Sequence, residues 1–204
     1  MIHQQYQKLV AQIYDPFMRS LEKVLSSHRQ KLLRQTKGNV LEVGAGTGVN
    51  FPLYPPAVKV WAIEPSKPMY ERAKKVAEKY PHIQLFNIGI EQINEIDNRP
   101  KHFDFITSML VLCTIKNPEN AAKKYKENLK DNGKLLVLEH IHSSKKWYGQ
   151  FQQIINPIWR PLADGCHLTR RQDKILKAAG FEPEYENYFK LGTDWYEAIM
   201  KKKK

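Results

Sequence analysis

Apolar positions along this chain follow two periods, which alternate from one segment to the next. Short apolar runs typical of buried strands cover residues 40–43, 58–63, 83–88, 103–108, 134–139, 181–189 and 193–200. Between them, apolar residues recur at helical spacing in segments 69–80, 121–129 and 175–179. Strands that alternate with helices predict a parallel α/β sheet covered by helices on both faces.

Turn and cap residues set the expected boundaries of these elements. Ser66 is expected to be the N-cap of a helix that Pro81 ends. Asp131 to Gly133 predict a turn before the clearest strand of the chain. Thr169 to Gln172 match a capping box, so a helix is expected to begin there and to end at Gly180.

Two further segments lie outside the strand and helix alternation. Apolar residues within 6–13 and 17–25 predict two short helices that meet at Asp15–Pro16, within an N-terminal helical cap over residues 1–30. These helices either cover the mouth of a site or close one edge of the sheet. Residues 141–168 are rich in Trp, Gln, His, Asn and Pro, and long insertions at strand ends are often functional, so we expect a substrate lid there.

The stretch from Val40 to Phe51 organises the prediction of a ligand site. Its apolar run enters three alternate glycines, Gly44, Gly46 and Gly48, which predicts a buried strand that turns sharply into a helix at a nucleotide-like ligand. A dinucleotide fingerprint requires glycine at position 49, where the chain has Val49. The acidic residue that ends the next strand, Glu64, is placed to take both hydroxyls of a ribose.

Composition narrows the class of protein. The 204 residues suit one domain, and 42% hydrophobic residues predict a folded globule. The net charge of +12 suits nucleic acid, anionic membrane or acidic substrates, but the lysines are scattered over predicted helix faces. We therefore expect a solvated basic surface and no specific nucleic acid partner. An RNA-binding or cofactor-binding module without catalysis is the alternative of a different class.

Compartment and redox state follow from what the sequence contains. No signal-peptide core and no uncharged segment of spanning length is present, which predicts a cytoplasmic protein. The amphipathic N-terminal helices and basic surface are compatible with weak peripheral association with an anionic membrane. Cys113 and Cys166 are far apart in the sequence, so a disulfide is not expected. The oligomeric state is not predicted.

The segment Leu41 to Gly48, together with Glu64, resembles the first two motifs of class I S-adenosylmethionine-dependent methyltransferases. This resemblance implies a Rossmann-like, doubly wound, mostly parallel seven-stranded sheet with an antiparallel last strand, in one domain over residues 1–204. It also implies S-adenosylmethionine as the cofactor. Gly89 stands where an adenine-binding Asp is common in the family, which leaves adenine recognition to the backbone and Glu91. The residues assigned to the cofactor are Glu42, Gly44, Ala45, Gly46, Thr47, Gly48, Glu64, Pro65, Ser66, Met69, Ile90, Glu91, Ser108 and Met109.

Downstream, the resemblance narrows to the methyltransferase-like family of thiol S-methyltransferases. It rests on segments 110–113 and 138–140, on aromatic and amide residues between 147 and 159, and above all on Asp164 to Arg170, Asp-Gly-Cys-His-Leu-Thr-Arg. Members of that family in animals carry an apolar N-terminal membrane segment, which this sequence does not show. The resemblance implies a small thiol as methyl acceptor. An N-, O- or C-methyltransferase acting on a lipid, a quinone precursor or another small molecule is the alternative.

Methyl transfer requires alignment of the acceptor and removal of one proton. His140 and Asp164 are the predicted catalytic residues, although a histidine at a strand end is often only hydrogen-bonded and an Asp-Gly pair is often only a turn. The spacing of the histidines and cysteines matches no compact zinc signature, so no metal is expected. Residues predicted to line the acceptor pocket are Cys113, His142, Trp147, Trp159, Cys166 and His167.

Overall fold

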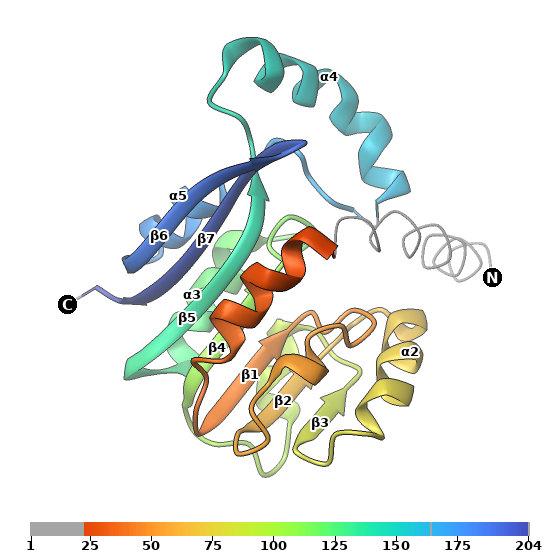
Figure 1. Ribbon diagram of the computed structural model, residues 1–204, viewed down its shortest axis with the longest axis vertical. Coiled ribbons are helices and arrows are strands. Elements are labelled where there is room, and N and C mark those ends of the chain that lie inside the picture. The colour runs from red at the N-terminus through yellow and green to blue at the C-terminus, as the bar shows by residue number, and fades with distance from the viewer. Residues whose placement is uncertain (1–22, 164, 204) are drawn as a thin grey trace.

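The computed structural model describes residues 23–163 and 165–203. These residues form a seven-stranded sheet in the order β3-β2-β1-β4-β5-β7-β6 (Figure 1). The strands β1 to β5 are parallel, and β7 lies antiparallel between β5 and β6. This is the Rossmann-like methyltransferase fold that the sequence predicts. The strands are β1 (Asn39–Val43), β2 (Lys59–Ile63), β3 (Ile83–Phe86), β4 (Phe103–Met109), β5 (Leu129–Ile141), β6 (Phe181–Leu191) and β7 (Thr193–Lys202).

Helices cover both faces of the sheet. The helix over residues 23–33 and α2 (Lys67–Ala77) pack on one face through Leu25, Leu32 and Ala73. The opposite face carries α3 (Pro118–Asn128), α5 (Gln172–Ala178) and the 3-10 helix η2 (Ile90–Glu95). Consecutive residues of a strand point to opposite faces, so each strand contributes to two cores.

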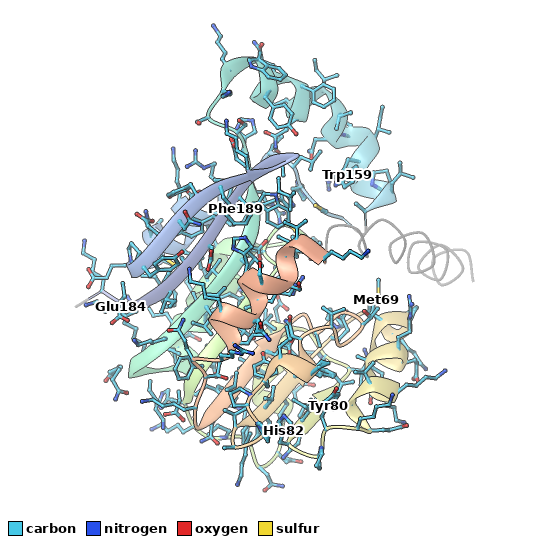
Figure 2. The ribbon with its side chains drawn as sticks, viewed as in Figure 1. Met69, Tyr80, His82, Trp159, Glu184 and Phe189 are labelled. Carbon is cyan, nitrogen blue, oxygen red and sulfur yellow. The ribbon has the colours of Figure 1, made fainter. Side chains whose placement is uncertain are left out.

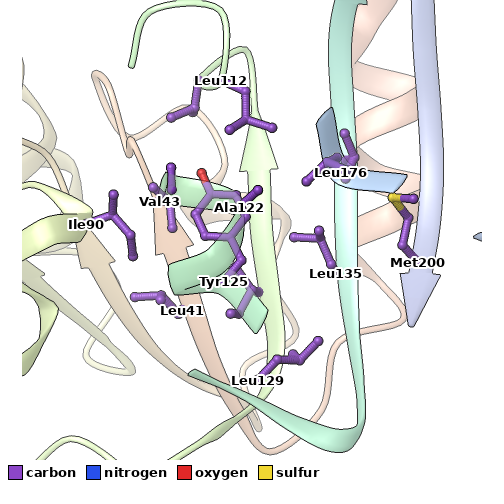
Figure 3. Close-up of a cluster of buried hydrophobic side chains, with 14 of the residues drawn as sticks. Leu41, Val43, Ile90, Leu112, Ala122, Tyr125, Leu129, Leu135, Leu176 and Met200 are labelled. Atoms are coloured by element: carbon purple, nitrogen blue, oxygen red, sulfur yellow. The ribbon is translucent and has the colours of Figure 1, made fainter. Parts of the chain in front are cut away.

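Strand β1 shows this division. Leu41 and Val43 join the cluster that contains Tyr125, Leu129 and Leu135 (Figure 3), whereas the neighbouring Val40 joins the cluster under the helix over residues 23–33. All of the β1 side chains from Val40 to Val43 are buried. Glu42 is therefore an acidic side chain inside the apolar layer, which costs free energy unless its oxygens are hydrogen-bonded.

The predicted turn at residues 131–133 lies within β5. In the β4–β5 ladder, Phe103 pairs with Leu129 and Phe105 pairs with Lys134, so residues 130–133 all stand opposite Asp104. The extra residues form an irregularity in the strand instead of a turn before it. Lys130 Nζ lies 2.7 Å from Asp104 Oδ1, which fixes this irregularity to β4.

The expected start of the last helix at Thr169 is wrong. Helix α5 begins at Gln172, and its N-cap residue, Arg171, makes no side-chain capping bond. The Arg170 carbonyl accepts a hydrogen bond from the His142 N–H at 2.8 Å. Because that carbonyl is engaged with the end of β5, the chain turns into a helix only afterwards.

The segment over residues 141–168 contains a helix, α4 (Lys146–Leu162), which stands apart from the sheet in Figure 1. Pro157 and Pro161 lie within it, and prolines are poor helix-interior residues, so the sequence did not predict a helix here. One face of α4 exposes large apolar side chains: Trp147, Phe151, Ile154, Ile158 and Leu162. Among the described residues, no helix is both long enough and apolar enough to cross a membrane.

Near the N-terminus, the described structure starts within the second predicted helix. The first predicted helix, over residues 6–13, and most of the second lie outside the described residues. The helix that is described runs from residue 23 to residue 33, beyond the expected end at residue 25.

Substitution in the central strand should destabilise the fold strongly. Leu135 is fully buried in β5, so Leu135→Ala leaves a cavity and should lower the free energy of unfolding by about 2–5 kcal/mol. Ile154→Ala is the control, because Ile154 is 76% exposed on α4 and should change the free energy by less than about 0.5 kcal/mol. Urea unfolding followed by circular dichroism measures both values. Equal effects of the two substitutions would contradict this assignment of the core.

Candidate active site

The glycine turn follows β1 at the carboxyl edge of the sheet. β1 lies between β2 and β4, and the strand order reverses there, which is where ligands bind in open α/β sheets. Gly44 and Gly46 have φ angles of 67° and 58°, which favour glycine. The turn leads to a single 3-10 turn, η1 (Phe51–Leu53), and not to the predicted α-helix. Prolines at 52, 55 and 56 lack the N–H groups that an α-helix would use there.

Two glycines of this turn have different surroundings. A Cβ atom on Gly44 would lie 2.6 Å from Val111 Cγ2, so the absence of a side chain lets the loop after β4 pack directly on the turn. A Cβ atom on Gly46 would meet no atom within 4 Å. The backbone of Gly46 therefore borders free space, which fits a ligand that lies against the turn.

Glu64, just beyond β2, connects the glycine turn to the segment that leads into α2. Its Oε2 accepts a hydrogen bond from the Gly46 N–H and its Oε1 accepts one from the Ser66 N–H, both at 2.8 Å. Each carboxylate oxygen has a second lone pair, so the same group retains acceptor capacity toward ribose hydroxyls. In this structure Glu64 also positions the turn, a role that the sequence did not predict.

Glu42 anchors a polar chain beneath the turn. Its Oε1 accepts a hydrogen bond from Asn50 Nδ2 at 2.8 Å, and Asn50 Oδ1 accepts one from Arg29 Nη1 at 2.9 Å. Burial raises the pKa of Glu42 to about 7, and the bond from Asn50 opposes this effect. Glu42 Oε2 accepts no hydrogen bond from the described residues. An unsatisfied buried oxygen below a glycine turn fits a polar ligand group there.

The other predicted cofactor residues divide into two groups. Ala45 is buried on the turn, and its N–H donates to the Ile63 carbonyl at 3.0 Å, while Met69 is buried on α2 and labelled in Figure 2. Ile90, Ser108 and Met109 are buried in the protein interior. Residues at least partly exposed around the turn and η2 are Thr47, Gly46, Pro65, Ser66 and Glu91, whereas Gly48 is buried against Phe51.

The loop over residues 110–115, which follows β4, is held from both sides. Glu139 Oε1 accepts hydrogen bonds from the Val111 and Leu112 N–H groups at 2.8 and 2.9 Å. Arg170 Nη1 donates to the carbonyls of Leu112, Cys113 and Ile115 at 2.7, 2.9 and 2.6 Å. Burial raises the pKa of Glu139 to about 7, against the effect of the two N–H donors.

This loop brings Cys113 to His140 and Cys166, which we call the Cys-His-Cys cluster. His140 Nε2 and Cys166 Sγ lie 3.0 Å apart, and one ligand atom from each of the three residues lies within 4.8 Å of the others. All three side chains are buried. The His167 N–H donates to the Cys113 carbonyl at 2.9 Å and so ties the two cysteine-bearing loops together.

The pKa values of the three side chains in the cluster shift in different directions. The hydrogen bond from Cys113 and the nearby His140 hold the pKa of the Cys166 thiol well below its usual range, despite burial. The same bond to Cys166, together with burial, raises the pKa of Cys113. Burial disfavours the charged imidazole, but Cys166 outweighs this effect and raises the pKa of His140. His140 and Cys166 thus shift each other's pKa across their 3.0 Å contact, upward for His140 and downward for Cys166.

The predicted acceptor-pocket residues do not all meet at this cluster. Trp159 lies on α4 (Figure 2), and its side chain contributes to lowering the pKa of Cys166. His167 flanks the cluster through its backbone, whereas the His142 imidazole donates to the Gly149 carbonyl at 3.2 Å. Trp147 is 68% exposed and packs edge-on against Tyr148. Asp164, the second predicted catalytic residue, lies outside the described residues.

A surface pocket of ≈ 280 Å³ lies elsewhere, between the end of β5 and the strands β6 and β7. His142 lines it together with Arg171, Tyr188 and Asp194, and none of the predicted cofactor residues does. Its position at β6 and β7, on the far side of β5 from β1, separates it from the glycine turn.

Several residues of the site were given no role by the sequence analysis. Asn50 and Arg29 complete the chain below Glu42, while Glu139 and Arg170 hold the loop that carries Cys113. A charged residue within an otherwise apolar strand, as at Glu139, is a signal that could have indicated a buried role. Arg29 and Asn50 carry no comparable pattern.

Comparison with known proteins agrees with this geometry. A model of the methyltransferase domain matches residues 17–186. A solved S-adenosylmethionine-dependent methyltransferase from Leishmania major superposes with a TM-score of 0.68 at 16% identity, over 97% of this chain and 81% of that one. The chain belongs to the class I S-adenosylmethionine-dependent methyltransferases, in the thiol S-methyltransferase family, and its cofactor is S-adenosylmethionine.

Two curated relatives carry that family name. Human thiol S-methyltransferase TMT1A is 32% identical over 190 residues, which cover 90% of this chain and 76% of the relative. Rat thiol S-methyltransferase TMT1B is 30% identical over 191 residues, which cover 84% of this chain and 77% of the relative. The family and the enzymatic class thus agree with the resemblance found in the sequence.

Gly46→Val should weaken cofactor binding strongly. The added side chain enters the free space beside the turn, so affinity for S-adenosylmethionine should fall on the order of 100-fold in calorimetric titration. Gly192→Val is the matched control, because Gly192 also has a positive φ, 68°, and free space around its Cβ position, but lies in the β6–β7 turn. Unchanged affinity in the Gly46 variant would contradict the position of the cofactor.

Glu42→Gln should change how stability depends on pH. The folded-state pKa of Glu42 is raised from 4.5 to about 7, so its contribution is fully favourable below pH 4.5 and is lost as the pH rises through 7. The variant should therefore gain stability relative to the original chain between pH 4.5 and 8, by about 3 kcal/mol at most. Urea unfolding without cofactor at both pH values measures this. The difference at pH 4.5 is the internal control, and a constant difference would contradict the raised pKa.

Proposed function

We propose that this enzyme transfers the methyl group of S-adenosylmethionine to a small, fairly apolar thiol. The Cys-His-Cys cluster carries this proposal, because one of its members, Cys113, lies on the loop that packs against the glycine turn. Val111, which occupies the place of a Gly44 side chain, is two residues before Cys113. The names of the relatives support the same acceptor class.

The chemistry requires modest assistance from the protein. Bound S-adenosylmethionine supplies a methyl group that is already activated as a sulfonium. A free thiol has a pKa of about 8.5, and its thiolate is the nucleophile, so the protein must mainly remove one proton and align the sulfur. Cys113 of the cluster lies on the loop that packs against the turn, and the buried thiols and imidazole suit an uncharged, sulfur-containing acceptor.

His140 is the residue on which removal of the proton depends in this proposal. It lies 6% exposed near the end of β5, and its Nε2 contacts Cys166 Sγ. Asp164 remains a predicted second catalytic residue. The segment over residues 141–168, with α4, is the proposed lid, and Trp159 is the aromatic side chain that it brings near Cys166.

His140→Ala should separate chemistry from cofactor binding. Loss of the imidazole should lower turnover of a thiol by about 100-fold or more, while affinity for S-adenosylmethionine changes less than about twofold. His102→Ala is the control, because His102 precedes β4 at the opposite, amino edge of the sheet. Both variants are assayed with methyl-labelled cofactor, and equal turnover would remove His140 from the mechanism.

The acceptor class is tested with the full chain and labelled cofactor. A panel of small alkyl and aryl thiols is compared with amines and phenols of matched size. We expect methylation of the thiols, because amines and hydroxyls need a stronger base than the buried cluster supplies. Methylation of amines or phenols without any thiol product would overturn the proposed acceptor and support the N- or O-methyltransferase alternative.

A further inference from the structure

The Cys-His-Cys cluster joins three ligand-type side chains from separate parts of the chain. Cys113 follows β4, His140 belongs to β5, and Cys166 follows α4. Their exposed fractions are 2%, 6% and 8%. Each of the three residues offers one possible ligand atom, and these three atoms all lie within 4.8 Å of one another. Two thiols and one imidazole are a donor set that suits a soft or borderline metal ion such as Zn²⁺.

The distances suit a tetrahedral ion. Zinc lies about 2.3 Å from sulfur and 2.0–2.1 Å from nitrogen, so tetrahedral ligand atoms are about 3.5–3.8 Å apart. The observed separation of His140 Nε2 and Cys166 Sγ is 3.0 Å, and the largest separation in the cluster is within 4.8 Å. Side-chain movements of about 1 Å would bring all three atoms to an ion between them.

The backbone around the cluster holds the two cysteines at this spacing. Glu139 and Arg170 fix the loop of Cys113, and the His167 N–H joins that loop to the loop of Cys166. A disulfide would require the two sulfurs to approach to about 2.05 Å and would leave the imidazole without a role. The convergence of all three side chains is better explained by a shared ion.

We propose that Cys113, His140 and Cys166 bind a Zn²⁺ ion whose fourth position takes the sulfur of the acceptor thiol. Three protein ligands with one open position are the arrangement of catalytic zinc sites. The sequence predicted no metal because linear spacing cannot indicate ligands that come from three separate segments. This proposal deepens the proposed function and rests on it for the identity of the fourth ligand.

The ion would explain how the acceptor ionises in a buried site. As the zinc–sulfur bond forms, the acceptor thiol loses its proton to solvent, because a coordinating thiol is deprotonated outright. His140 then promotes this loss as a ligand of the ion and not as the base. The acceptor sulfur then forms a bond to the methyl carbon, while the bond from that carbon to the cofactor sulfur breaks and leaves its electron pair there. The product is a thioether, a weaker zinc ligand than a thiolate, and it can leave.

The metal site is tested first by composition and spectroscopy, without activity. The purified full chain should contain about one zinc ion, measured by plasma mass spectrometry. After exchange with Co²⁺, it should show thiolate-to-cobalt charge transfer and the intense visible bands of a tetrahedral ion. Cys113→Ser and Cys166→Ser should each lose most of the metal while retaining affinity for S-adenosylmethionine, which shows that they fold. His102→Ala is the control and should retain the metal.

The proposed site would be overturned if metal-free wild-type chain failed to bind Zn²⁺ or Co²⁺. It would also be overturned if both cysteine variants retained their metal. A disulfide between Cys113 and Cys166 would overturn the site as well. It is sought by mass spectrometry of the alkylated chain, after purification under air with zinc present. The open position is tested by adding 2-mercaptoethanol to the Co²⁺ form. A stronger charge-transfer band supports binding of the thiol, and an unchanged spectrum overturns the fourth-ligand assignment.

The two proposals fail in distinguishable ways. If the chain binds zinc at these residues but methylates only amines or phenols, the thiol acceptor is wrong and the metal site stands. If chelator-treated, metal-free chain methylates thiols at the original rate, the zinc proposal is wrong and the thiol acceptor stands. Restoration of lost thiol turnover by added Zn²⁺ supports both.

Discussion

The loop over residues 110–115 depends on two oppositely charged side chains that bind opposite polar groups of the same backbone. Glu139 accepts from its N–H groups, and Arg170 donates to its carbonyls. Leu110, at the start of the loop, has a φ of 63°, a left-handed conformation that costs a non-glycine residue about 1–2 kcal/mol. These hydrogen bonds offset that strain and give partners to the N–H and carbonyl groups of the loop. In consequence, Val111 packs on Gly44 and Cys113 lies beside His140 and Cys166, so one loop contacts both the glycine turn and the Cys-His-Cys cluster.

Most of the fold could be predicted because it follows from local patterns. The apolar runs of β1 to β4 and the stripes of α2 and α3 carry the periods of their elements, and the structure has them within a few residues. Predictions were wrong where tertiary contacts override a local signal. The turn residues at 131–133 lie within β5 because β4 pairs with the strand on both sides of them. The helix expected at Thr169 starts later because the Arg170 carbonyl is already bonded to the end of β5.

The site could be predicted only where it is contiguous in sequence. Gly44, Gly46 and Glu64 belong to two adjacent motifs, and the topology of parallel strands brings their ends together. The Cys-His-Cys cluster is different, since its members are 27 and 26 residues apart and meet only through the loop and α4. The family resemblance marked each of them separately. Their mutual contact, and the supporting roles of Glu139 and Arg170, depend on three-dimensional packing that no spacing in the sequence encodes.

The buried or partly buried carboxylates at the two edges of the sheet differ in how fully they are hydrogen-bonded. At the amino edge, the charged side chain of Asp104 is paired with Lys130 and bonded to the Asn39 N–H, and these contacts lower the pKa of Asp104 despite partial burial. At the carboxyl edge, burial raises the pKa of both Glu42 and Glu139 to about 7, and each retains an oxygen without a hydrogen bond from the described residues. A buried carboxylate oxygen without a hydrogen bond lowers the stability of the ligand-free protein. A ligand that donates a hydrogen bond to it removes this loss. For Glu42, we propose that this ligand is the cofactor at the glycine turn. The other oxygen of Glu139 accepts the N–H groups of the loop and so holds Cys113 beside His140 and Cys166, where we propose that a metal ion binds the acceptor sulfur.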